Sequence, residues 1–90
     1  MSLTRQTAVA GQFYPAEPLD LQNTVDQLLT GAKTDKTCPK AIVAPHAGYI
    51  YSGSTAAQAY ARVANGRDRI SRVVVLGPAH RVGFRGMALS

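Results

Sequence analysis

Two short segments made only of apolar residues constrain the fold of this chain more than any other feature. They are residues 41–44 (Ala-Ile-Val-Ala) and 73–76 (Val-Val-Val-Leu), followed directly by Pro45 and Gly77. Uniformly apolar runs of this length indicate strands covered on both faces, as in parallel sheets. The alanine-rich stretch between them predicts a helix over about 54–64, which ends near Asn65. We therefore expect a right-handed β-α-β unit with parallel strands.

The part of the chain before this unit predicts an irregular arm and one helix. Residues 1–18 contain one glycine and two prolines around the aromatic pair Phe13 and Tyr14, which favours an arm with an apolar anchor. From Leu19 onward the apolar residues recur at helical spacing, which predicts a helix over about 19–31 with Gly31 at its stop.

A chain of 90 residues with 46% hydrophobic and 17% charged residues has the composition of one globular domain. However, two helices do not cover a two-stranded parallel sheet and close its edges. We therefore expect residues 1–90 to form a single partial α/β domain, the amino-terminal part of a larger parallel-rich domain or one whose sheet is completed by another chain. We also expect the isolated chain to be unstable as a monomer.

Composition limits the setting and the partners of the chain. No apolar run approaches the roughly 20 residues needed to cross a bilayer, and a lone cysteine, Cys38, forms no disulfide within the chain. We expect a cytoplasmic protein without membrane contact. The net charge is +5, but the basic residues are spread out without interleaved aromatic rings, so we expect no binding of nucleic acid.

Each of the two histidines follows one of the apolar runs. His46 lies two residues beyond the first run and His80 four residues beyond the second. Ligands bind at the carboxyl ends of strands in open α/β sheets. If the two strands are neighbours, both imidazoles are within reach of one ion, whereas an intervening strand separates them by ~10 Å and the loops must then lean together. Imidazole suits iron, copper, zinc and nickel. The alternative is that each histidine only hydrogen-bonds its own loop.

The stretch after His46 predicts a binding position at the beginning of the following helix. Ser52 is expected to cap that helix, whose N-terminus favours an anionic group. Tyr49 and Tyr51 flank the position, although either ring serves equally well to pack against the helix. Cys38 precedes the first run, so a strand length separates it from His46 and makes it a poor metal ligand.

Three motifs in this order resemble the Memo-like family, also called AmmeMemoRadiSam system protein B. They are Ala-Gly-Gln-Phe-Tyr-Pro at 10–15, Pro-His-Ala-Gly-Tyr at 45–49 with Tyr-Ser-Gly at 51–53, and Gly-Pro-Ala-His at 77–80. The resemblance covers about residues 5–90, whereas family members are close to three times as long. It implies a fold similar to class III extradiol ring-cleaving dioxygenases, whose metal pocket lies over a parallel-rich sheet.

The resemblance also implies a site. His46 and His80 match the two metal-associated and catalytic histidines of the family, with iron(II) or copper as the metal. The third family ligand is a cysteine in a later part of the chain, so it is not among these residues. Phe13 and Tyr51 match aromatic pocket positions of the family. With their neighbours in the sequence, we expect the pocket to be lined by Phe13, Tyr14, Gly48, Tyr49, Tyr51 and Ser52.

Two functions follow from the resemblance. One is a metal-dependent oxidoreductase related to the dioxygenases, and microbial family members occur with a radical-enzyme partner. The alternative is a non-enzymatic protein that binds a peptide or a small anion in a degenerate dioxygenase-like pocket. An enzyme needs the metal, whereas a binding protein keeps its ligand without it.

Overall fold

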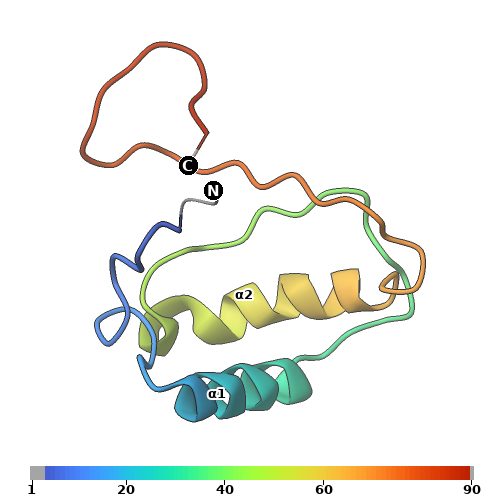
Figure 1. Cartoon of the computed structure of the whole chain (residues 1–90). Helices are drawn as coiled ribbons and strands as arrows, with labels where there is room; N and C mark the ends of the chain where they lie inside the picture. Colours follow the sequence, from blue (N-terminus) through green and yellow to red (C-terminus); the bar gives the residue numbers. More distant parts are fainter. Residues whose placement is uncertain (1–3, 90) are drawn as a thin grey trace.

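The computed structural model describes residues 4–89, which contain two α-helices, α1 (Pro18–Gly31) and α2 (Tyr49–Ala64). The helices pack side by side and run in the same direction (Figure 1). Because they run in the same direction, the connection 32–48 must return along the length of α2 before α2 begins. The segment 71–79 also runs back against the direction of α2 (Figure 1).

Helix α1 occupies the segment in which apolar residues recur at helical spacing. Pro18 stands in its first turn, where a missing N–H costs no helical hydrogen bond. The half-buried residues Leu21, Val25 and Leu28 share one face. At the other end the helix includes Gly31, and the N–H of Ala32 donates to the Leu29 carbonyl at 3.2 Å.

Small residues on α2 form the contact with α1. Gly53, Ala57 and Ala61 recur at every fourth position and are the buried residues of this helix. At Gly53 the approach is closest, because an added Cβ would lie 3.0 Å from Cδ1 of Leu28. This stripe of small side chains therefore lets the two helix backbones come together.

Helix α2 begins at Tyr49, five residues before the start that the sequence predicts. The Gly48 carbonyl accepts hydrogen bonds from the N–H groups of Tyr51 at 2.9 Å and Ser52 at 3.0 Å, which closes the first turn. Gly48 is the N-cap and no side chain caps the helix. The expectation that Ser52 is the cap is therefore wrong, because this residue lies inside the helix.

The two apolar runs are extended in the structure but are not paired. Within residues 4–89 the backbone forms no strand, and only an isolated bridge joins Ala10 and Tyr14. The side chains of residues 73–76 are between 72% and 84% exposed. The parallel β-α-β unit therefore stays a prediction, since no sheet is present in the described part of the chain to test it.

Neither of the two described helices is long and apolar enough to cross a membrane.

Candidate functional site

The structure brings the two histidines together at the beginning of α2. The Nε2 atoms of His46 and His80 lie 3.1 Å apart, although 34 positions separate the residues in the sequence. Their ring centroids are 5.2 Å apart and the ring planes are inclined by 47°. Both side chains are exposed. In the absence of an ion this contact is a hydrogen bond, in which one ring donates its Nε2 proton to the other.

The loop that carries His46 is anchored on both sides. Pro45 fixes the backbone before it, and Gly48 behind it starts α2. From within α2, the hydroxyl of Ser52 reaches back to the loop and donates to the carbonyl of Ala47 at 3.0 Å. His46 is therefore presented by a short, hydrogen-bonded turn.

The amino-terminal arm packs against the same end of α2. The N–H of Tyr49 donates to the Phe13 carbonyl at 2.8 Å, and the rings of Tyr14 and Tyr49 lie 5.7 Å apart. A Cβ added to Gly48 would lie 3.6 Å from this same carbonyl oxygen, so the arm approaches the glycine closely. The backbone of the arm turns at Gly11, whose φ of 84° favours glycine.

The predicted pocket residues differ in how far they are covered. Gly48, Tyr49, Tyr14 and Ser52 are half-buried, whereas the Phe13 side chain is 44% exposed and that of Tyr51 is 81% exposed. The structure therefore gathers these residues at one end of α2 but leaves the Tyr51 ring largely in solvent.

The two imidazoles fit a metal ion. Nitrogens 3.1 Å apart can both lie about 2.1 Å from one ion, with a nitrogen–metal–nitrogen angle of roughly 95°, which suits neighbouring ligands. Within residues 4–89 no third His, Cys, Asp or Glu completes a group that could hold an ion.

Cys38 lies at the opposite end of α2 from the histidines. Its Sγ atom is 3.7 Å from the carbonyl oxygens of Pro39 and Val63, and a Cβ added to Gly66 would overlap it. The half-buried thiol is therefore a packing group against the turn that follows α2.

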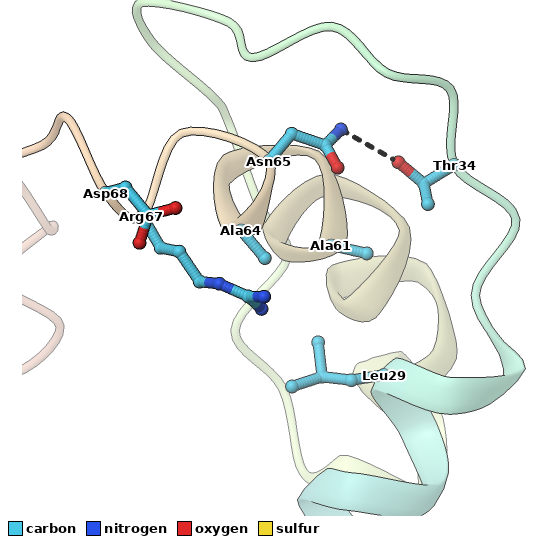
Figure 2. A pocket seen from close by; sticks show the side chains of 7 residues that line it. All are labelled: Leu29, Thr34, Ala61, Ala64, Asn65, Arg67 and Asp68. Atoms are coloured by element: carbon cyan, nitrogen blue, oxygen red, sulfur yellow. Dashed lines mark hydrogen bonds between the residues drawn. The ribbon is translucent and has the colours of Figure 1, made fainter.

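A depression of about 430 Å³ lies between the carboxyl ends of the two helices (Figure 2). Its lining residues are Leu29, Thr34, Ala61, Ala64, Asn65, Arg67 and Asp68. On its rim the Asn65 side-chain amide donates to the carbonyls of Asp35 at 2.6 Å and Thr37 at 2.8 Å. It also lies 3.4 Å from Thr34 Oγ1, the bond drawn in Figure 2.

Sequence reasoning missed this role of Asn65. The sequence marks Asn65 and Gly66 only as a helix stop, because the acceptors of the amide lie about 30 residues earlier in the chain. No local pattern indicates such a pairing. The depression contains neither histidine, so it is separate from the paired imidazoles.

Comparison with known proteins places the chain among a group of longer proteins. A family model described as "Memo-like protein" matches residues 5–90. A "MEMO1 family protein" from Aquifex aeolicus is 46% identical over 76 residues, which cover 84% of this chain and 27% of the relative.

Two animal relatives match over nearly the whole chain. Protein MEMO1 of Xenopus tropicalis is 44% identical over 99% of this chain, and that of Homo sapiens is 40% identical over 96%. The chain spans less than a third of the length of these relatives, with 29% and 28% covered. No solved structure matches the chain significantly. On the family match and these identities, the chain belongs to the Memo-like family.

Proposed function

We propose that the chain provides part of a metal-dependent oxidoreductase site related to that of the extradiol dioxygenases. In this site His46 and His80 are two of the ligands, and iron(II) or copper is the metal. The observation that carries the proposal is the 3.1 Å separation of the two Nε2 atoms. Two imidazoles and one further protein ligand, with the other positions open, is the arrangement of non-haem iron oxygenases, and the two histidines supply the first part of it.

The residues around the pair have separate tasks in this proposal. A bound iron or copper ion supplies Lewis acidity and one-electron redox chemistry. His46 and His80 hold the ion as neutral ligands, and the exposure of both rings leaves a side open for a substrate. The N-terminus of α2 lies beside them and favours a negatively charged group of that substrate. The rings of Tyr14 and Tyr49 bound the position on the side of the arm.

In residues 1–90 a metal ion would have the two imidazoles as its protein ligands, and water would fill its other positions. The resemblance assigns the third ligand to a cysteine outside these residues, and Cys38 is not a substitute because it packs beyond the far end of α2. Each imidazole is then one of only two protein ligands. Removing either should lower the affinity by orders of magnitude.

The test is a calorimetric titration of iron(II) without oxygen, copper(II) and zinc(II) into the chain, supported by elemental analysis. We expect His46→Ala and His80→Ala each to lower the affinity at least about a hundredfold, because each removes a ligand outright and not only a group that orients one. Cys38→Ala is the matched control and should bind as the unaltered chain does. Equal affinity in the unaltered chain and both histidine variants would eliminate the metal site.

A binding protein without metal chemistry is the second candidate. The aromatic rings of Phe13, Tyr14, Tyr49 and Tyr51 near the N-terminus of one helix favour it, because they offer stacking surfaces beside a position suited to an anion. The discriminating measurement is binding of phosphate or of a phosphorylated tyrosine peptide in the presence of EDTA. Binding that persists without metal, together with unchanged metal affinity in the histidine variants, supports this function instead.

A further inference from the structure

A hydroxyl group from α2 reaches back to the loop that carries His46. Ser52 Oγ donates to the carbonyl of Ala47 at 3.0 Å and lies 3.4 Å from that of Gly48. Serine in a helix often bonds the carbonyl four residues earlier, which here is Gly48. The shorter bond instead goes to Ala47, which precedes the helix and is the neighbour of His46. The hydroxyl therefore restrains the loop as well as the helix.

The two histidines are not held equally. His46 sits between Pro45 and the anchored first turn of α2, whereas His80 lies in the segment 71–89, which is exposed throughout and outside both helices. The His80 ring makes its polar contact with the His46 ring. The direction of the His46 loop thus decides where the two nitrogens meet.

We propose that Ser52 is a positioning residue for His46, an inference that rests on the proposed role of the histidine pair. By holding the Ala47 carbonyl, the Ser52 hydroxyl fixes the Ala47–Gly48 peptide plane, one residue beyond His46, and so restrains the loop that directs the His46 imidazole toward His80. Groups that orient a metal ligand affect metal affinity without touching the metal.

A metal-free measurement tests the geometry directly. In the unaltered chain the ring protons of His46 and His80 should give a nuclear Overhauser contact, since their Nε2 atoms are 3.1 Å apart. We expect Ser52→Ala to lose this contact while the helical circular dichroism signal is retained. Ser52→Thr keeps the hydroxyl and should restore the contact. Ser54→Ala, at an exposed position of the same helix, is the matched control and should leave it unchanged.

Copper(II) titration provides the second readout. Ser52→Ala should weaken copper binding about tenfold, and Ser52→Thr should recover most of that affinity. A Ser52→Ala chain that keeps both the ring contact and the affinity would overturn the positioning role. Loss of helical signal in Ser52→Ala would also overturn it, whether or not Ser52→Thr recovers that signal, because the substitution would then act on the helix and not on the direction of His46. If the unaltered chain shows no histidine-dependent copper binding, the proposed function fails, whereas the ring contact still decides the role of Ser52.

Discussion

The carboxylate of Asp35 shows how single residues shape the connection between the helices. The Thr37 side chain and backbone N–H both donate to it, and these bonds lower the pKa of Asp35 below its usual value. A carboxyl group with a lowered pKa contributes stability above its unfolded pKa and loses that contribution as the pH falls through its folded pKa. The contribution of this exposed carboxylate is therefore absent in strong acid.

We predict that Thr37→Val raises the pKa of Asp35 toward its ordinary value, because the hydroxyl donor is the largest cause of the shift. The measurement is an NMR titration of the Asp35 carboxyl carbon between neutral and acidic pH. Thr34→Val is the matched control, since the Thr34 hydroxyl donates to the backbone carbonyl of Asp35 and not to its carboxylate. A Thr37→Val chain with an unchanged titration curve would contradict the assignment.

At the scale of elements, the contact between α1 and α2 depends on the absence of a side chain at Gly53. The terminal methyl of Leu28 already lies 3.0 Å from the position of an added Cβ. We predict that Gly53→Leu separates the helices and lowers the free energy of unfolding by about 1–3 kcal/mol. Thermal melting followed by circular dichroism at fixed protein concentration measures the effect.

Gly31 at the end of α1 is the control for this substitution. An added Cβ at Gly31 meets no atom within 4 Å, so Gly31→Leu should change the melting temperature much less. If both leucine variants melt alike, close packing at Gly53 does not hold the helices together.

The same contact explains why the start of α2 was not predictable from the sequence. Glycines at positions 48 and 53 favour a loop by their local conformational freedom. In the structure only Gly48 ends the loop, while Gly53 serves the packing of α1 against α2, which is a tertiary effect. The apolar stripe and proline of α1, by contrast, are local signals, and that helix occupies the segment they mark.

The strands and the candidate site depend on contacts between residues that are far apart in the sequence. The sequence predicts that His46 and His80 meet beyond two parallel strands, and their nitrogens lie 3.1 Å apart. Their role as metal ligands and the pairing of 41–44 with 73–76 stay proposals. A strand needs neighbours on its edges to form hydrogen bonds, and the exposed run 73–76 has none in the described part of the chain.

At the scale of the whole molecule, the chain is expanded for its length. Its radius of gyration is 14.9 Å, against roughly 12 Å for a compact domain of this size. Large apolar side chains are exposed along the segment 71–89 and at Val43, which is 98% exposed. Surface of this kind favours association, because burying it removes apolar area from water.

We predict that the isolated chain associates with itself as its concentration rises. Sedimentation velocity from about 1 to 100 µM should show an increasing sedimentation coefficient, a range in which weak apolar interfaces assemble. Hydrogen exchange should show protection confined to the helices. A compact monomer with protected amides in residues 71–79 would refute this prediction.

The contact between His46 and His80 also closes a loop of the chain around α2. Holding together two points 34 positions apart costs the unfolded chain roughly 3 kcal/mol of loop-closure entropy. Any bond between the two imidazoles, whether a shared proton or a shared ion, therefore acts as a noncovalent cross-link that restricts the segment leading to His80. Ordering of that segment and occupancy of the site are then thermodynamically linked, so whatever strengthens one strengthens the other.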